Sequence, residues 1–259
     1  MSDNLPERAE SHNALHYLLR VVLKFVPGPD LRYPLSIPAV RDIERREFHP
    51  AVTFLVGENG SGKSTIVEAL AVLMGMNAEG GSPNFNFSTR ASHSALSEML
   101  RPVRGLRRPA HRFFLRAESY FNLATAIEAL DREPGGGPPI IDSYGGKSLH
   151  EQSHGESFMA LMQHRFQDNG LYILDEPEAA LSPQRQLAML VRMHDLVRDG
   201  CQFIVATHSP LLMTCPDATI YALDDDGIRR VALRETEHYR VTTSFLRDPE
   251  KRVADLLRD

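Results

Sequence analysis

The sequence predicts an α/β fold, a mostly parallel β-sheet flanked by helices, and three observations support it. Strand-like apolar runs alternate with helix-like runs along most of the 259 residues, as in sheets whose strands are connected by helices. A glycine-rich motif that contains a lysine stands between one such strand and one such helix. Two further apolar strands, at 171–174 and 202–206, end in polar residues, and open α/β sheets bind ligands at that edge.

Length and composition indicate one domain over 1–259. With 42% hydrophobic residues, the chain can bury a large core. We expect that core at about 15–100 and 158–245, with a reduced helical and signature-bearing insertion at about 101–157. The formal net charge of −5 gives no overall attraction to nucleic acid or anionic lipid, and leaves room for a local basic patch.

Cysteine usage and the N-terminal sequence indicate the compartment. Cys201 and Cys215 are too few for a disulfide framework and lack the spacing of a zinc site, which favours a reducing compartment. The N-terminus lacks the basic end and apolar stretch of a signal peptide, and no window approaches the roughly 20 apolar residues of a membrane span. We therefore expect a soluble, cytoplasmic protein without a transmembrane segment.

The N-terminal half is expected to begin with an antiparallel pair of strands. Residues 17–26 and 31–37 suit two short strands, since each is apolar and is ended by proline. The run 51–56 suits a buried strand, and 66–74 has the apolar spacing of a helix. The segment 77–97 is rich in Gly, Ser and Asn, which favours a surface loop.

The C-terminal half alternates strands and helices and then closes with a hairpin. Proline at the first turn favours a helix start at residue 183, and the Asp-Asp-Asp-Gly stretch favours a turn between the last two strands. The expected strands are 112–118, 171–174, 202–206, 219–223 and 228–233, and the expected helices are 121–130, 157–166 and 183–198.

The most specific motif follows the strand at 51–56. Its eight residues match G-x-x-x-x-G-K-[ST] in full, in the order strand, phosphate loop, helix. In this motif the glycines let backbone N–H groups converge on phosphate oxygens, Lys63 reaches the β and γ phosphates, and the Ser64 hydroxyl binds Mg²⁺. If the motif were only a glycine-rich turn that connects the strand to the helix, the lysine and the hydroxyl would have to occur there by chance. The expected ATP-binding residues are Gly57, Glu58, Asn59, Gly60, Ser61, Gly62, Lys63, Ser64 and Thr65.

Two carboxylates follow the strand at 171–174. Alone, such a pair equally suits a solvated turn or a helix N-cap. Together with a phosphate loop, it favours a division of roles in which Asp175 binds Mg²⁺ and Glu176 polarises the attacking water. The expected metal ligands are therefore Ser64 and Asp175.

A histidine follows the strand at 202–206. A lone histidine at a strand end is more often a structural hydrogen-bonding residue than a catalytic one. Beside the other two motifs, His208 is interpreted as a contact to the γ phosphate or to the attacking water. The expected catalytic residues are Glu176, His208 and Lys63.

Taken together, these motifs resemble the ABC-type ATPase superfamily in order and spacing over about residues 15–245. More narrowly, they are similar to stand-alone bacterial predicted ATPases of the AAA-21 kind, in which the signature reads Ser-His-Gly-Glu-Ser. The segments that carry the resemblance are Gly57 to Thr65, Ser153-His-Gly-Glu-Ser157, Leu171 to Glu178, Ala180-Leu-Ser182 and Thr207-His-Ser209.

The resemblance implies a head-to-tail homodimer that encloses two ATP molecules. The signature of one protomer, here Ser153, Gly155 and Glu156, would close on the nucleotide bound by the other. Free N–H groups and the positive dipole end of a helix starting near Ser153 would face the phosphate. An ordinary capping box, with Ser153 as N-cap and Glu156 three residues later, explains the same residues and is compatible with that role. The implied D-loop is Ala180, Leu181 and Ser182.

The chain departs from the superfamily pattern at two places. Its signature has His154-Gly155-Glu156 where Gly-Gly-Gln is usual, which puts a carboxylate near phosphate. No glutamine stands where the Q-loop is expected. Glu118 is the candidate substitute, and a surface partner for Arg116 is its alternative role. For the aromatic residue that stacks on adenine, Tyr33 is the upstream candidate, with a core role as the alternative.

The function expected from these motifs is Mg²⁺-dependent ATP hydrolysis, coupled to a conformational change of the dimer. The first hypothesis for the target is nucleic acid or a defence process. An arginine-rich segment motivates it, and a solvated basic face or a contact across the dimer is the alternative. The arginines expected to contact nucleic acid are Arg101, Arg104, Arg107, Arg108 and Arg112.

Two other functions fit parts of the sequence. The chain could be the ATP-binding subunit of a transporter with a separate membrane permease, although the segment between Glu118 and Ser153 is short for a coupling surface. A phosphate-loop kinase acting on a small metabolite conflicts with the signature and with the Asp175-Glu176 pair.

Overall fold

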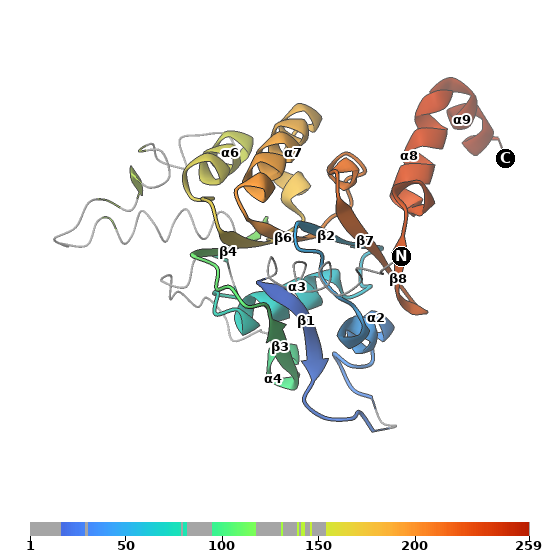
Figure 1. The fold of residues 1–259 in the computed structure, drawn as a ribbon. Helices are drawn as coiled ribbons and strands as arrows, with labels where there is room; N and C mark the ends of the chain where they lie inside the picture. Colours follow the sequence, from blue (N-terminus) through green and yellow to red (C-terminus); the bar gives the residue numbers. More distant parts are fainter. Residues whose placement is uncertain are drawn as a thin grey trace, which may run out of the picture.

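The computed structural model describes residues 17–28, 31–78, 80–81, 95–117, 131, 139, 141–142, 146 and 154–258. Within them, one six-stranded sheet forms the centre of the molecule (Figure 1). Its strands lie in the order β4 (His111–Arg116), β5 (Gly170–Asp175), β6 (Gln202–Ala206), β2 (Val52–Gly57), β7 (Ala218–Asp224) and β8 (Gly227–Val231). The first five are parallel, and β8 pairs antiparallel with β7. The expected mostly parallel sheet is confirmed.

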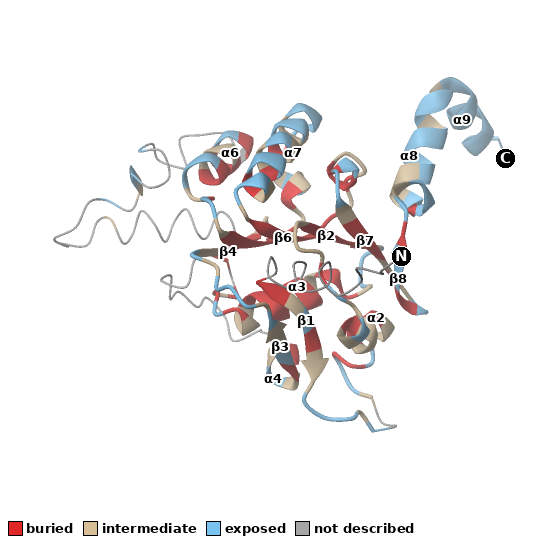
Figure 2. Ribbon diagram, in the orientation of Figure 1, coloured by how far each residue is buried: buried red, intermediate tan, exposed pale blue. Residues whose placement is uncertain are grey.

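Helices cover both faces of this sheet. On one face lie α3 (Lys63–Leu73) and α2 (Pro38–Asp42), and on the other lie α6 (His154–His164) and α7 (Pro183–Arg198) (Figure 1). Strand β2 is buried over nearly its whole length and supplies both layers, since alternate side chains of a strand point to opposite faces. Phe54 packs in the cluster under α6 and α7, whereas Leu55 packs in the cluster under α3. Burial is concentrated in the central strands (Figure 2).

A small antiparallel sheet lies beside α3, with a different pairing from the one expected. Strand β1 (Leu18–Leu23) pairs with β3 (Leu100–Arg104), which follows the short helix α4 (Leu96–Met99). The predicted strand at 31–37 is wrong: residues 33–36 form a turn, and α2 begins at Pro38. The reason is local, because the N–H of Ser36 bonds back to the carbonyl of Arg32 and Pro38 starts the helix.

The other elements agree with the sequence where the structure describes them. The predicted strands at 51–56, 171–174 and 202–206 and the helix at 183–198 are confirmed, as is the final hairpin. Strand β4 lies inside the range 101–157, yet it forms an edge of the main sheet, and the rest of that domain division stays a prediction. The predicted helix at 121–130 and most of the loop at 77–97 lie outside the described residues.

Two helices at the C-terminal end are not predicted by the sequence analysis. They are α8 (Glu237–Arg247) and α9 (Pro249–Leu256), which extend away from the sheet and bury none of their residues (Figures 1 and 2). No described helix is both long and apolar enough to cross a bilayer. The short 3-10 helices are η1 (Ile43–Arg45), η3 (Pro177–Ala180), η4 (Leu212–Thr214) and η5 (Leu233–Glu235).

The strand order places the three motifs together. Strands β5, β6 and β2 are neighbours and parallel, so the segments that follow them leave the same edge of the sheet. These segments carry the two carboxylates, the histidine and the glycine-rich loop.

Candidate functional site

The glycine-rich loop turns between β2 and α3 at positions that require glycine. Gly62, the N-cap of α3, has φ +99°, a left-handed conformation that costs side-chain-bearing residues energy. A Cβ on Gly57 would lie 2.2 Å from the carbonyl oxygen of Leu223. The loop can therefore pass close to the backbone of Leu223, and the N-terminus of α3 faces the site.

Lys63 is buried at the start of α3. Its Nζ donates hydrogen bonds of 2.8 Å to the carbonyl oxygens of both Gly57 and Glu58. Burial lowers the pKa of Lys63, and the nearby carboxylates of Glu176 and Asp175 act in the opposite direction. The ammonium group is thus held against the phosphate loop and close to both carboxylates.

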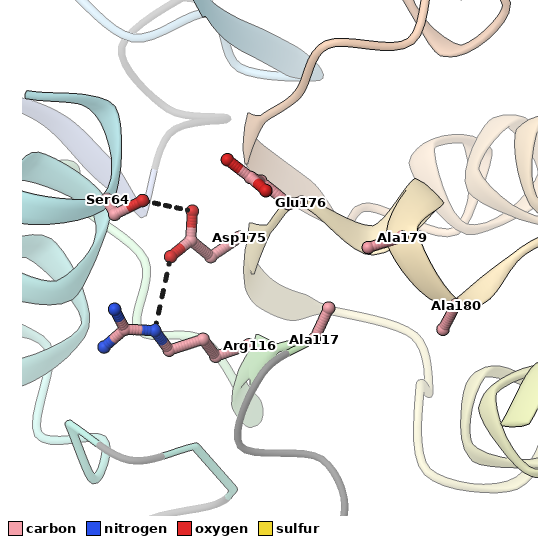
Figure 3. Close-up of a pocket in the computed structure, with 7 residues that line it drawn as sticks. All are labelled: Ser64, Arg116, Ala117, Asp175, Glu176, Ala179 and Ala180. Atoms are coloured by element: carbon pink, nitrogen blue, oxygen red, sulfur yellow. Dashed lines mark hydrogen bonds and ion pairs between the residues drawn. The ribbon is translucent and has the colours of Figure 1, made fainter. Parts of the chain in front are cut away.

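Ser64 and Asp175 form the candidate metal site. Ser64 Oγ donates to Asp175 Oδ1 at 3.1 Å, although the two residues are 111 positions apart (Figure 3). A hydroxyl and a carboxylate are hard oxygen ligands, the kind that Mg²⁺ selects. The structure therefore brings together the two residues expected to bind the metal, and their chemistry fits it.

Arg116, at the end of β4, is a site residue that the sequence analysis did not assign. Its Nε lies 3.6 Å from Asp175 Oδ2 (Figure 3). Its Nη1 donates to Glu68 Oε2 at 3.1 Å. The sheet register sets this contact, because Arg116 lies directly opposite Asp175 in the β4–β5 pair. The signal in the sequence is a basic residue that ends an apolar strand, but it becomes informative only once the strand order is known.

Glu176 points away from Asp175 because its backbone is left-handed. It has φ +50° and ψ +50°, and its N–H bonds to the carbonyl oxygen of Ala206 at 2.9 Å. Its Oε1 lies 3.3 Å from Nε2 of His208. The carboxylate is partly exposed, so water can reach it, as the expected role requires.

His208 is held at three points. Its backbone N–H donates to Glu178 Oε1 at 2.5 Å, its Nε2 faces Glu176, and its Nδ1 lies 2.9 Å from Nε2 of His238. The next residue along the chain is also fixed, since Ser209 Oγ donates to Gln186 Oε1 at 2.6 Å. The structure thus places all three expected catalytic residues at one site and adds His238, which no motif indicates.

Two hollows border these residues. One, of about 240 Å³, lies between the carboxylates and η3 (Figure 3). It is lined by Ser64, Arg116, Ala117, Asp175, Glu176, Ala179 and Ala180. The other, of about 360 Å³, lies between the glycine-rich loop, the β7–β8 turn and the start of α8. The loop and the carboxylates therefore border open space from which a ligand can approach.

The signature segment packs against the segment expected to be the D-loop. Gly155 is buried, and a Cβ there would lie 2.3 Å from Arg185 Nη1 and 3.1 Å from the carbonyl oxygen of Ala180. Glu156 is exposed and forms an ion pair with Arg185 at 3.3 Å. Ser182 is the N-cap of α7 and accepts a bond from the N–H of Arg185.

The remaining predicted site residues differ in how the structure places them. Ser153 and the Q-loop candidate Glu118 lie outside the described residues. Leu181 is buried in the core under α7, between the two other D-loop residues. Tyr33 is exposed, and its hydroxyl lies 3.4 Å from Thr65 Oγ1, which places its ring beside the phosphate loop and outside the core.

The arginine-rich segment has structural contacts that the sequence analysis did not foresee. Arg104 and Arg112 donate to the carbonyl oxygens of Leu73 and Met74, at the C-terminal end of α3. Cations at that end stabilise a helix by satisfying carbonyls and opposing the dipole. Arg107 donates to the Asn169 side chain, and Arg101 and Arg108 are exposed.

Comparisons with known proteins agree with the motifs. A family model described as "AAA domain, putative AbiEii toxin, Type IV TA system" matches residues 86–214, and a model described as "AAA domain" matches residues 39–104. The chain is 28% identical over 170 residues to the cytochrome c biogenesis ATP-binding export protein CcmA of Rhodopseudomonas palustris (strain BisB5). This match covers 61% of the chain and 78% of the relative.

Solved structures similar to the chain include the SMC head domain from Thermotoga maritima, with 19% identity and a TM-score of 0.38. That match covers 72% of this chain and 91% of the other. Another is cbiO1 from Clostridium perfringens, part of the ABC transporter complex cbiONQ, with 16% identity and a TM-score of 0.47, covering 93% and 99% of the two chains. The matched family models and the sequence relative, taken with the three motifs that meet at one sheet edge, support membership of this chain in the ABC-type ATPase superfamily.

Proposed function

We propose that the chain binds and hydrolyses Mg-ATP. One observation carries the proposal: functional groups from three separate motifs meet at the same edge of the sheet, within hydrogen-bond or ion-pair distance of one another. Ser64 contacts Asp175 at 3.1 Å, and Glu176 contacts His208 at 3.3 Å. Superfamily membership supports the same reaction.

Binding would use the glycine-rich loop and the start of α3. Lys63 would exchange its bonds to the loop carbonyls for oxygens of the β and γ phosphates, while loop N–H groups and the N-terminus of α3 face the same anion. Ser64 and Asp175 would hold Mg²⁺, which offsets phosphate charge when it is bound. Tyr33 would stack its exposed ring on the adenine.

Hydrolysis would use the two residues that face each other beside this cradle. Glu176 would orient the attacking water and take up its proton, because its carboxylate is partly exposed and points away from the metal ligand Asp175. His208 would donate a hydrogen bond from Nε2 to an oxygen of the γ phosphate. Arg116 would keep Asp175 and Glu68 from repelling each other, since it contacts both carboxylates.

We further propose an ATP-dependent homodimer in which Ser153, Gly155 and Glu156 of a second copy close on the nucleotide. The pairing of Glu156 with Arg185 supports this role, because a guanidinium at 3.3 Å offsets the negative charge that this signature would bring to phosphate. Gly155 supports it too, since its lack of a side chain lets α6 approach Arg185 and Ala180 closely.

Steady-state phosphate release tests the proposed hydrolysis. Lys63→Ala should abolish ATP binding and turnover, because no other described cation lies against the loop carbonyls. Glu176→Gln should bind ATP and lose about 10²- to 10⁴-fold in kcat, the usual contribution of a general base. Glu98→Gln, a matched change at an exposed position on α4, should keep wild-type turnover. Wild-type turnover in Glu176→Gln would show that another group activates the water.

For the target, we infer a nucleic-acid-associated or defence process. The family model whose description names a toxin of a toxin–antitoxin system supports it, as do the exposed arginines Arg101 and Arg108. Because Arg104 and Arg112 cap α3, the surface available for phosphate contacts is smaller than the sequence indicates. A DNA gel shift at low salt, weakened steeply by added salt, would support this target, and no shift at low salt would count against it.

The second candidate function is the ATP-binding subunit of a transporter. The sequence relative, an ATP-binding export protein, favours it. Co-purification with an integral membrane protein would support this function over the first.

We also infer a cytoplasmic location. Cys201 and Cys215 are both free and buried, and burial raises the pKa of each thiol to about 11. Such thiols are typical packing residues of proteins in a reducing compartment.

A further inference from the structure

A histidine outside all of the motifs lies against His208. His238 is the second residue of α8, and its Nε2 is 2.9 Å from Nδ1 of His208. The two rings meet edge to face, with centroids 5.1 Å apart and planes at 60°. The start of α8 is fixed beside the site, because the N-cap Thr236 is buried and accepts the N–H of Tyr239.

This contact constrains where His208 carries its hydrogen. The Nε2 of His208 lies 3.3 Å from Oε1 of Glu176, an oxygen that can accept a hydrogen bond from an Nε2–H. A neutral imidazole that carries hydrogen on Nε2 has a lone pair on Nδ1. The Nε2–H of His238 can then donate to that lone pair, which completes a chain from His238 through His208 to Glu176.

The surroundings of His238 favour the neutral ring that this chain uses. Burial lowers the pKa of His238, and His208 and Lys63 lower it further. Glu237 and Glu58 act in the opposite direction and do not reverse the shift. His238 also lines the hollow of about 360 Å³ beside the glycine-rich loop, so it lies at the edge of the nucleotide site.

We propose that His238 is a positioning residue that holds His208 in the tautomer with hydrogen on Nε2. In this tautomer His208 presents a donor toward Glu176. The effect on hydrolysis rests on the proposed function, whereas the tautomer itself does not. The contact also ties the first turn of α8, and with it the C-terminal helices, to the catalytic edge of the sheet.

The first test is the tautomer in the absence of nucleotide. In the protein labelled with ¹⁵N-histidine at about pH 8, well above the usual histidine pKa of about 6.5, NMR should show hydrogen on Nε2 and a lone pair on Nδ1 of His208. His238→Ala should give a mixture of both tautomers, and His238→Gln should restore the wild-type state, because its amide N–H can donate to Nδ1. His194→Gln, a matched change at an exposed histidine on α7, should leave the His208 signals unchanged.

The second test is steady-state phosphate release by the same variants. His238→Ala should lower kcat about 5- to 10-fold with little change in KM, as expected for the loss of one hydrogen bond. His238→Gln should recover most of this loss, and thermal unfolding should confirm that both variants fold.

Each outcome decides the proposal. A wild-type His208 that carries hydrogen on Nδ1 alone overturns it, and this measurement does not depend on whether any variant folds. His238→Ala with an unchanged tautomer and an unchanged kcat overturns it as well. So does a His238→Ala variant that keeps the tautomer but loses turnover, if His238→Gln does not restore that turnover. If the wild-type protein releases no phosphate, the proposed function fails, and the NMR result alone decides the role of His238.

Discussion

At the scale of single residues, one backbone torsion separates the two carboxylates of the site. Among the described residues, Asn169, Glu176 and Asp217 have positive φ without being glycine. Asn and Asp tolerate this conformation, whereas a glutamate in it is strained by about 1–3 kcal/mol. This backbone conformation at Glu176 lets Asp175 point toward Ser64 and Glu176 toward His208. Adjacent residues can thus take the two different roles proposed for them.

Removal of the Tyr33 ring should weaken nucleotide binding without affecting folding. Tyr33 is 63% exposed, so Tyr33→Ala should leave the melting temperature nearly unchanged. Stacking of an aromatic ring on a base contributes about 1–3 kcal/mol, so the Kd for ATP measured by calorimetry should rise about 5- to 150-fold. Tyr33→Phe should bind like the wild type. An unchanged Kd in the alanine variant would place the adenine elsewhere.

Arg116→Gln should destabilise the protein more than the loss of an exposed ion pair does. Arg116 is about one-quarter exposed and contacts the nearly buried carboxylates of Asp175 and Glu68, so its removal takes a positive charge away from both. We expect the free energy of unfolding, measured in urea, to fall by about 1–2 kcal/mol. Arg229→Gln, which breaks the exposed pair with Asp224, should cost less than about 1 kcal/mol. Equal losses would mean that Arg116 does not stabilise these carboxylates.

At the scale of elements, the contact between α6 and the start of α7 links two segments of the proposed dimer surface. Gly155 at the first turn of α6 lies against Arg185 of α7 and against the last residue of η3, Ala180. The signature segment and the D-loop segment are therefore one packed unit. A change in one is expected to shift the other.

Gly155→Ala should separate these elements. The new Cβ would lie 2.3 Å from Arg185 Nη1 and 3.1 Å from the carbonyl oxygen of Ala180. Either α6 or the Arg185 side chain must therefore shift, at a cost of about 1–3 kcal/mol in stability. We expect phosphate release to fall while the Kd for ATP is unchanged, because the glycine-rich loop of the same protomer is not involved. Gly28→Ala, at a position with no heavy atom within 4 Å, is the matched control and should stay within about 0.5 kcal/mol of the wild type. Normal turnover in Gly155→Ala would argue against a role for this contact.

At the scale of the whole molecule, the site borders two hollows, and a second copy is proposed to close on it. Glu176→Gln with Mg-ATP should therefore accumulate as a dimer, because bound ATP persists when hydrolysis is slow. Light scattering should give a mass twice the 29.0 kDa of one chain. The double variant Lys63→Ala, Glu176→Gln should remain monomeric under the same conditions. A Glu176→Gln protein that binds ATP and stays monomeric would contradict the proposed dimer.

The sequence was sufficient to predict the elements that bear the motifs, and insufficient to predict which elements pair. Strands β2, β5 and β6 are recognisable because apolar runs end abruptly in polar residues. The Arg116 contact depends on β4 lying beside β5, and the β1–β3 pair joins segments about 80 residues apart, so neither follows from local pattern. His238 could not be predicted for the same reason, since it reaches His208 from a helix that has no motif of its own.

The two bonds that Lys63 makes to its own loop have a consequence for the affinity of the site for an anion. The carbonyls of Gly57 and Glu58 already occupy the ammonium group at the places where a triphosphate would compete for it, so they act as an internal stand-in for the anion. The loop is therefore ordered before a ligand binds, so the entropic cost of ordering it is met on folding and does not weaken binding.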